Sequence, residues 1–259
     1  MFIEAKKQKN HIMLGGDFLQ KGDILYEGKA KKLFETEDES LTVMHFKDDA
    51  TAFDGEKKAS LEDKGRLNNA ISSRFFRLLE NRGISTHFRD KISEREMLVE
   101  KVEIIPLEVV VRNAAAGSLE ERLGLDSGRA LDFPIVEYYY KSDALGDPLL
   151  NRYHIELLDL ACEEILDRME EQALTINEIL IDFLNARNIQ LVDFKLEFGL
   201  NRDGDLLLAD EITPDTCRFW DKDSGSSLDK DRFRQELGKV MEGYREIWSR
   251  LESDTGEVK

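Results

Sequence analysis

An α+β fold is what this sequence predicts, and the order of its elements, strands first and helices later, is compatible with that class. The chain has 259 residues, of which 41% are hydrophobic, so it can bury a large core and lies near the size at which one domain gives way to two. Pro106 interrupts a strand-like run over residues 104–112 and marks the predicted boundary between two lobes.

Short strand-like segments fill the first half of the chain. Residues 24–26 and 33–34 flank a glycine-containing turn, and residues 41–46 form the next predicted strand. A helix follows from Gly65, with apolar residues on one face and Gly83 as its C-terminal stop. Further strands are predicted near residues 86–88, 97–102, 104–112 and 138–141.

Helical periodicity dominates the second half of the chain. Two long helices are predicted over residues 155–172 and 176–187, and the second opens with a capping box formed by Thr175 and Glu178. The last predicted helix, over residues 230–251, carries an aromatic and aliphatic stripe that is typical of a core face.

The formal net charge of the chain is −17. Such a field repels polyanions, which argues against general nucleic-acid binding and against an anionic membrane surface. No apolar run approaches transmembrane length, and the first residues lack the apolar core of a signal peptide. The two cysteines match neither a disulfide framework nor a zinc site, so we expect a reducing, cytoplasmic compartment, with Cys162 buried in a helix.

The segment 191–221 organises the functional part of the prediction. Two apolar runs in it flank residues 201–204, whose Asp-Gly pair is typical of a hairpin turn. Because side chains alternate between the faces of a strand, Asp193, Lys195 and Glu197 share one face, opposite a face of apolar residues.

The length of the hairpin loop decides which carboxylate joins this charged face. A two-residue turn pairs Asp210 with Glu197, and a four-residue loop pairs Asp210 with Lys195. Either register places Asp210 on the charged face, whereas a three-residue loop places Glu211 there. We expect Asp210, and not Glu211, to join Lys195 and Glu197.

The charged face of the hairpin has two interpretations. Paired carboxylates suit a hard cation such as Mg²⁺, which prefers oxygen ligands and usually accompanies nucleotide phosphates. The other interpretation is a half-exposed hairpin whose charged side is solvated and salt-bridged. The pattern alone favours the solvated side, so the neighbouring motifs decide between the two.

Two further segments have a composition that suits bound anions. Gly28 lets the backbone approach a ligand closely, and Lys29 and Lys31 beside it suit phosphates, although a lysine-rich turn is also typical of a solvated loop. Arg112 precedes a run of small residues and Ser118, after which the pattern turns helical. This second segment either binds an oxyanion or uses Ser118 only as the N-cap of its helix.

Seven segments carry a resemblance to a known family. They are LYEGKAKKLF at 25–34, DDATAFDGEKK at 48–58, EIIPLEVVVRNAAAGS at 103–118, KSDALGDP at 141–148, LVDFKLEFG at 191–199, ADEITPDTCRFWD at 209–221 and LDKDRFRQELG at 228–238. The RN-x-AAGS and VDFKLEFG stretches are the most specific. With this set, the chain resembles the SAICAR synthetase family of purine biosynthesis over residues 23–251.

The resemblance implies an ATP-dependent ligase that joins L-aspartate to carboxyaminoimidazole ribonucleotide (CAIR) and gives SAICAR, ADP and phosphate through an acyl phosphate. It also implies a two-lobed fold related to ATP-grasp, with an antiparallel N-terminal lobe, a larger α+β C-terminal lobe, and ATP between them. On this basis residues 1–22 are an N-terminal extension, residues 23–105 the nucleotide-binding lobe, and residues 106–259 the substrate- and metal-binding lobe. Mg²⁺ and a homodimer are further implications.

The resemblance also implies the roles of individual residues. Those expected at ATP are Gly28, Lys29 and Lys31 on the phosphates, and Val99 and Glu103 in the segment that lines the adenine. Those expected at Mg²⁺ are Glu197 and Asp210. Those expected at the other substrates are Arg112, Ser118 and Arg218 on the 5′-phosphate of CAIR, Asp215 near its ribose, Lys195 at the reacting carboxylate, and Lys141 and Asp147 at aspartate. Asp193 and Asp215 are alternative acceptors for the proton of the amine.

Two other functions compete with a ligase. A kinase-like phosphotransferase would leave the phosphate on its product, but the HRD-x4-N loop of protein kinases is absent and Asp193-Phe194 is followed by Lys195 in place of glycine. A non-catalytic scaffold with this fold has no physical need for both signs of charge at the motif positions. We therefore expect an enzyme.

Overall fold

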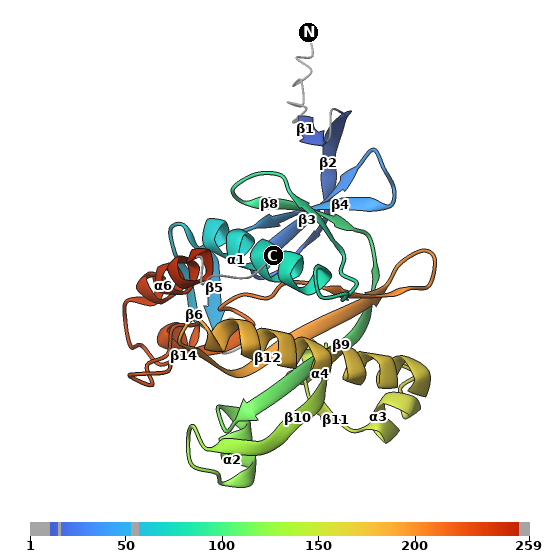
Figure 1. The fold of residues 1–259 in the computed structure, drawn as a ribbon. Helices are drawn as coiled ribbons and strands as arrows, with labels where there is room; N and C mark the ends of the chain where they lie inside the picture. Colours follow the sequence, from blue (N-terminus) through green and yellow to red (C-terminus); the bar gives the residue numbers. More distant parts are fainter. Residues whose placement is uncertain (1–10, 15–16, 53–56, 254–259) are drawn as a thin grey trace.

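The computed structural model describes residues 11–14, 17–52 and 57–253. These residues form an α+β fold with two antiparallel sheets and a two-stranded ribbon (Figure 1), which confirms the predicted fold class. Residues 1–10 and 15–16 of the predicted N-terminal extension and residues 53–56 of the DDATAFDGEKK motif lie outside the described part of the chain.

The first sheet is built from the N-terminal strands. In spatial order it contains β1 (His11–Leu14), β2 (Asp17–Glu27), β3 (Lys31–Thr36), β4 (Leu41–Phe46), β8 (Glu96–Glu100) and β7 (Phe88–Lys91). The strands predicted at residues 24–26, 33–34 and 41–46 are confirmed. The described part of the extension pairs with the sheet, because β1 and the start of β2 form a hairpin at its edge.

A ribbon and a long helix connect the strands of this sheet. The ribbon pairs β5 (Asp49–Ala52) with β6 (Lys57–Ser60), and α1 (Lys64–Glu80) follows. The helix ends at Glu80, and Gly83, the predicted stop, follows it with a φ of 86°. The N–H of Gly83 donates to the carbonyl of Glu80 and that of Ile84 to the carbonyl of Leu79, each at 3.0 Å, which is the Schellman pattern of a helix end.

The second sheet contains the strands that follow residue 102. In spatial order it contains β11 (Leu149–Leu150), β10 (Ala130–Tyr140), β9 (Glu103–Ala114), β12 (Ile189–Leu200) and β13 (Leu206–Ala209), and β14 (Cys217–Asp221) also pairs with β12. The helical elements of this half are α2 (Ser118–Leu123), the 3-10 turn η1 (Asp143–Leu145), α3 (Arg152–Leu157), α4 (Glu163–Asn185), α5 (Asp231–Arg234) and α6 (Val240–Glu252). Within the described residues, every helix lacks the length or the apolar character that crossing a membrane requires.

Pro106 does not interrupt a strand, contrary to the prediction. β9 runs through it, and the chain leaves the first sheet earlier, at residues 101–102. The register between β9 and β12 shifts between Glu108 and Ile104, so the missing N–H of proline falls at an irregular part of the ladder. The carbonyl of Pro106 accepts a hydrogen bond from the N–H of Lys141 at 3.1 Å. The division into two lobes stays a prediction, but proline does not cause it.

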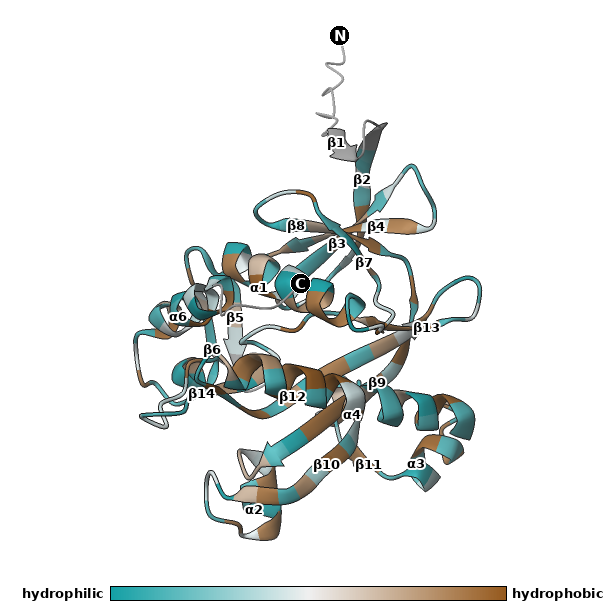
Figure 2. Cartoon of the chain, viewed as in Figure 1, coloured by the Kyte–Doolittle hydropathy of each residue, from teal (hydrophilic) through white to brown (hydrophobic). Residues whose placement is uncertain are grey.

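The predicted helix boundary at Thr175 is also wrong. α4 continues through this residue, whose hydroxyl donates to the carbonyl of Glu171 at 2.9 Å and so makes a bond inside the helix in place of a cap. Figure 2 shows hydrophilic and hydrophobic residues alternating along α4. The buried face is continuous across the predicted break and contains Leu166, Met169, Ala173, Ile176, Leu180 and Phe183.

The last predicted helix is in fact two helices, α5 and α6. Glu236, Gly238 and Lys239 between them all have positive φ, which a helix does not tolerate. The predicted core role of α6 is confirmed, because Tyr244 and Leu251 are buried.

The largest hydrophobic cluster of the described residues joins the two sheets through α1. The ring of Phe75 on α1 lies 6.1 Å from that of Phe183 on α4 and 6.1 Å from that of Phe219 on β14. β12 pairs with β9, β13 and β14 in the second sheet, and most of its residues are buried, whichever face they lie on. Its charged side is therefore not the solvated face of a half-exposed hairpin.

Candidate active site

The hairpin β12–β13 has the three-residue loop that the prediction disfavoured. Leu200 pairs with Leu206 and Glu197 with Ala209, and the N–H of Asn201 donates to the carbonyl of Asp205 at 3.0 Å. The loop closes with Gly204 in the left-handed region, at a φ of 82°.

This register alone would place Glu211, and not Asp210, on the charged face. The strand ends at Ala209, however, and Asp210 adopts a φ of 61°, which turns the chain so that two successive carboxylates reach the same site. Both Asp210 and Glu211 form ion pairs with Lys31. The expected position of Asp210 is therefore correct for the wrong reason, and the exclusion of Glu211 is wrong.

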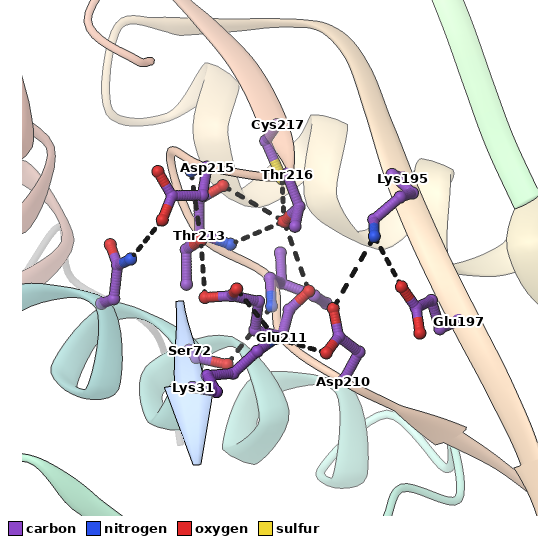
Figure 3. Close-up of polar contacts among 12 residues, drawn as sticks. Lys31, Ser72, Lys195, Glu197, Asp210, Glu211, Thr213, Asp215, Thr216 and Cys217 are labelled. Atoms are coloured by element: carbon purple, nitrogen blue, oxygen red, sulfur yellow. Dashed lines mark hydrogen bonds and ion pairs between the residues drawn. The ribbon is translucent and has the colours of Figure 1, made fainter. Parts of the chain in front are cut away.

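These side chains form a lysine–carboxylate cluster at the junction of the two sheets (Figure 3). Lys195 Nζ lies 2.5 Å from Glu197, 2.9 Å from Glu108 and 3.9 Å from Asp210. Lys141 Nζ lies 2.5 Å from the second oxygen of Glu197. The cluster consists of Lys31, Lys141, Lys195, Glu108, Glu197, Asp210 and Glu211.

The charges of this cluster stabilise one another. Burial lowers the pKa of Lys31 and of Lys195, but the neighbouring carboxylates outweigh it and raise both above their ordinary values. Burial raises the pKa of Asp210, but Lys31 and Lys195 outweigh it and lower the pKa of that carboxyl well below its usual range. All three groups are therefore charged at neutral pH.

A second group, the arginine cluster, lies along β9, β12 and β14. Arg112 donates from Nε to Glu137 at 2.6 Å and from Nη1 to Asp193 at 2.9 Å. Arg218 donates to the same Asp193 oxygen at 2.7 Å and to Asp231 at 2.6 Å. The cluster consists of Arg112, Arg218, Arg234, Glu137, Asp193 and Asp231.

Ser118 contacts the arginine cluster and is not the N-cap of α2. The cap of α2 is Gly117, and the Ser118 hydroxyl accepts a hydrogen bond from Arg112 Nη2 at 3.1 Å. Gly117 has a φ of 54°, and a Cβ there would lie 2.6 Å from Arg218 Nη2. The small residue is therefore required for the close approach of Arg218.

The pKa values of the two candidate proton acceptors shift in opposite directions, although both carboxyl groups are buried beside two cationic side chains. Burial raises the pKa of Asp193, although Arg218 and Arg112 oppose the shift. Burial would also raise the pKa of Asp215, but Lys64 and Lys230 outweigh it and lower the pKa far below its usual range. The carboxylate of Asp215 is further held by the hydroxyl of Tyr244 at 2.7 Å and the amide of Asn68 at 2.8 Å.

A single cavity of about 1030 Å³ joins the two clusters. Its wall includes every predicted site residue except Glu103, namely Gly28, Lys29, Lys31, Val99, Arg112, Ser118, Lys141, Asp147, Asp193, Lys195, Glu197, Asp210, Asp215 and Arg218. Glu103 is exposed and lies outside this wall, so its predicted ATP contact finds no support. The neighbouring residues Lys101, Val102 and Ile104 line the cavity instead.

The prediction missed several charged residues of the wall, among them Glu108, Glu211, Lys230 and Arg234. A signal existed for Glu108, because it is a lone acid inside an apolar strand and it pairs with Glu197. Glu211 was excluded because hairpin loops of two or four residues place Asp210, and not Glu211, on the charged face. Lys230 and Arg234 are four residues apart, a spacing that is also typical of charged residues on the solvated face of a helix. The sequence therefore gave no signal that they line a site.

The two cysteines take no part in the charged clusters. Cys162 is exposed at the start of α4, so the expectation that it is buried is wrong. Cys217 is buried in the cavity wall, and burial raises the pKa of its thiol well above the usual range. Cys217 is therefore an uncharged packing residue.

Comparison with known proteins identifies the family. The model of the family described as SAICAR synthetase matches residues 24–251. The chain belongs to the SAICAR synthetase family. The phosphoribosylaminoimidazole-succinocarboxamide synthase of Coprothermobacter proteolyticus is 56% identical over 233 residues, which cover 90% of this chain and 99% of that protein.

Solved structures of SAICAR synthetases have the same fold. The phosphoribosylaminoimidazole-succinocarboxamide synthase of Ehrlichia chaffeensis has a TM-score of 0.87 and 46% identity, covering 88% of this chain and 98% of that one. A SAICAR synthetase solved in complex with ADP has a TM-score of 0.86 and 53% identity, covering 89% of this chain and 97% of that one. Membership of the SAICAR synthetase family, inferred above from the motifs, is thereby confirmed.

Proposed function

We propose that this protein joins L-aspartate to CAIR at the expense of ATP, and that the lysine–carboxylate cluster is its reaction centre. The observation that carries the assignment is the single cavity that brings the phosphate-binding turn, this cluster and the arginine cluster together. A similar SAICAR synthetase has been solved with ADP, which supports ATP as the nucleotide substrate here.

The nucleotide would lie against the first sheet. Gly28, Lys29 and Lys31 are assigned to the phosphates, because they lie in the turn that opens β3 and face the cavity. Val99 on β8 is assigned to the adenine. Lys31 connects this part of the site to the carboxylates that follow β13.

The carboxylates of Glu197 and Asp210 would suit a Mg²⁺ ion that is also bound by the phosphates of the nucleotide. Among the described residues, no three His, Cys, Asp or Glu side chains are grouped so as to hold a metal ion. Mg²⁺ needs no such group, since one or two carboxylates and substrate phosphates usually bind it. When bound, it would offset negative charge on the transferred phosphate. The carboxylates now pair with lysines, so these lysines would have to share them with the ion.

CAIR would lie between the two clusters. Arg112, Ser118 and Arg218 are assigned to its 5′-phosphate, and guanidinium groups suit the two-pronged binding of such a group. Asp215 is assigned to the ribose, because its low pKa makes it a permanent hydrogen-bond acceptor. Lys141 and Asp147 are assigned to aspartate.

The chemistry of the proposal has two steps. The carboxylate of CAIR attacks the γ-phosphorus of ATP, the bond to ADP breaks, and an acyl phosphate forms next to Lys195. The neutral amine of aspartate then attacks the acyl carbon, the amide forms, and phosphate leaves. The site acts by orientation and by charge compensation. Asp193 and Asp215 are both proposed as acceptors of the amine proton: the pKa of Asp193 is raised and that of Asp215 lowered, but Arg112 and Arg218 both donate to the same oxygen of Asp193.

We also propose a cytoplasmic homodimer. The exposed apolar side chains on α3, Tyr153 at 81% and Leu157 at 82% exposure, support a surface that a second subunit covers. The two free cysteines fit a reducing compartment, and the charge of −17 disfavours nucleic acids and anionic membranes as partners.

One assay tests the proposed function. Purified protein given CAIR, ATP, Mg²⁺ and L-aspartate should release ADP and form the succinocarboxamide product in equal amounts. Release of ADP that is independent of aspartate, with no amide formed, would contradict the ligase and favour a phosphotransferase.

A further inference from the structure

Lys31 is shared by two successive carboxylates that differ in their surroundings. Its Nζ forms an ion pair with Asp210 and lies 2.9 Å from Glu211 Oε1. The side chain of Glu211 is 3% exposed, whereas that of Asp210 is 17% exposed. The two carboxylates therefore differ in how easily they can exchange their partner.

Glu211 is held in place by the loop that follows it (Figure 3). The hydroxyl of Thr213 donates to Glu211 Oε2 at 3.0 Å, and that of Thr216 donates to the Glu211 carbonyl at 3.3 Å. The next N–H along the chain, that of Ile212, donates to Ser72 Oγ on α1 at 3.2 Å. Both carboxylate oxygens of Glu211 are thus engaged, and turning the side chain would break a buried hydrogen bond.

Asp210 has more freedom than Glu211. It lies between Lys31 and Lys195, and its Oδ2 is still 3.9 Å from Lys195. It faces the cavity, and it is one of the two proposed Mg²⁺ ligands. A divalent cation at Asp210 would draw the carboxylate away from Lys31 and would also repel the ammonium group.

The pair of Lys31 and Glu211 links the two sheets. Lys31 opens β3 in the first sheet, whereas Glu211 follows β13 in the second. Lys31 also lies at the end of the glycine-containing turn that is assigned to the nucleotide phosphates. The position of this turn relative to the second sheet therefore depends on a buried contact with Glu211.

We infer that Glu211 is a positioning residue that keeps Lys31 in place for the nucleotide, while Asp210 exchanges between Lys31 and Mg²⁺. Two adjacent carboxylates then have separate roles. This inference rests on the proposed function, in which Lys31 binds nucleotide phosphates and Asp210 binds the metal.

The test compares Glu211→Gln with Glu211→Leu, which remove the same charge. Glutamine keeps an oxygen that accepts from Lys31, whereas leucine has a similar volume and no acceptor. Measured by calorimetry with ADP and Mg²⁺, we expect Glu211→Leu to bind about tenfold more weakly than Glu211→Gln, the size of one lost charge-assisted hydrogen bond. The KM for CAIR should differ by no more than about twofold between the two variants, as expected for an effect confined to the nucleotide.

Two further measurements decide whether Glu211 acts through Lys31. In a Lys31→Met background the difference between the two Glu211 variants should vanish. The Mg²⁺ concentration for half-maximal activity should shift in Asp210→Asn but not in Glu211→Gln. Equal ADP affinity of the two Glu211 variants, a difference that persists without Lys31, or a Mg²⁺ shift in Glu211→Gln would each overturn the inference.

A second variant keeps the test decisive if Glu211→Leu does not fold. Thr213→Val leaves the charge of Glu211 but frees its Oε2, and we expect ADP binding weakened by about threefold, less than for a lost ionic contact. Wild-type ADP affinity in this variant would count against the positioning role. If Lys31→Met alone leaves ADP affinity unchanged, the phosphate assignment in the proposed function fails, and the inference fails with it.

Discussion

The two charged clusters occupy the same cavity but differ in chemistry. The lysine–carboxylate cluster places three lysines among four carboxylates, whereas the arginine cluster pairs three arginines with three carboxylates. A lysine ammonium is a compact point charge that shares its partners readily. An arginine guanidinium is a planar fork with fixed directions. The first cluster suits the exchange of a cation, and the second suits a substrate phosphate of defined geometry.

Burial makes this difference consequential. Glu197 is 6% exposed and Arg112 is 4% exposed, so neither can leave its partners for bulk water. Removing one member of a buried ion pair costs several kcal/mol, because its partner stays charged without compensation. The informative substitutions therefore keep the shape of the side chain and change only its charge or its hydrogen-bonding geometry. Such substitutions can be made in both clusters of the cavity.

The largest effect is expected at the lysine–carboxylate cluster. Glu197→Gln and Asp210→Asn should each lower kcat by about 100-fold, because a charge that organises the transferred phosphate is lost. The Mg²⁺ requirement should rise in both variants, measured by titrating Mg²⁺ at saturating substrates. Each variant should also melt at a lower temperature than the wild type, because the lysines that pair with these carboxylates keep their charge. Asp205→Asn, an exposed acid on the same hairpin, is the matched control. A wild-type Mg²⁺ dependence would remove the two residues as metal ligands.

A smaller and different effect is expected at the arginine cluster. Arg218→Lys keeps the charge but loses the fork that reaches Asp193 and Asp231, so the KM for CAIR should rise by about tenfold. The KM for ATP should stay unchanged. Arg218 is the better choice for this test, because Arg112→Ala would remove one of the two arginines that pair with each of the buried carboxylates of Glu137 and Asp193.

The reverse substitution at the other cluster sharpens the comparison. Lys195→Arg should lower kcat more than it raises the KM for CAIR, because the fork does not fit among Glu108, Glu197 and Asp210. If Lys195→Arg and Arg218→Lys change the same kinetic constant, the two clusters do not have separate roles.

The smallest effect concerns His87, which lies beside the lysine–carboxylate cluster. Burial lowers its pKa to about 4, so the folded protein holds it neutral while the unfolded chain binds a proton near pH 6.5. Stability from this group is therefore complete above pH 6.5 and is lost as the pH falls toward 4. At pH 5 the loss is on the order of 2 kcal/mol relative to pH 7.5.

A urea titration at both pH values measures this loss. His87→Phe should lose less stability than the wild type on acidification, because it cannot bind the proton. Equal losses in the two proteins would show that His87 is not held neutral and that the cluster has a positive neighbour.

Most of the candidate site was predictable because its motifs are local. Strand periodicity placed Asp193, Lys195 and Glu197 on one side of β12, and the structure confirms that they face the same cavity. The stop at Gly83 was predictable for the same reason, because a residue with positive φ ends a helix wherever it packs.

The errors occurred where a local signal was ambiguous. Hairpin loops of two and three residues both contain an Asp-Gly pair, and one residue of difference moves every side chain to the other face. Thr175 has the composition of an N-cap, yet the apolar face of α4 buries enough surface to carry the helix through it. Pro106 breaks an ideal strand but not one whose pairing already shifts.

What the sequence determined by itself is the inventory of charged side chains and the motifs that relate them to a family. Only the tertiary structure decided their pairing. Lys31 meets Asp210 across 179 residues of chain, and Arg112 meets Asp193 across 81. Local periodicity carries no information about such distances. The physical reason is desolvation: a buried charge needs a partner, and the fold brings together residues that are far apart in the chain to provide it.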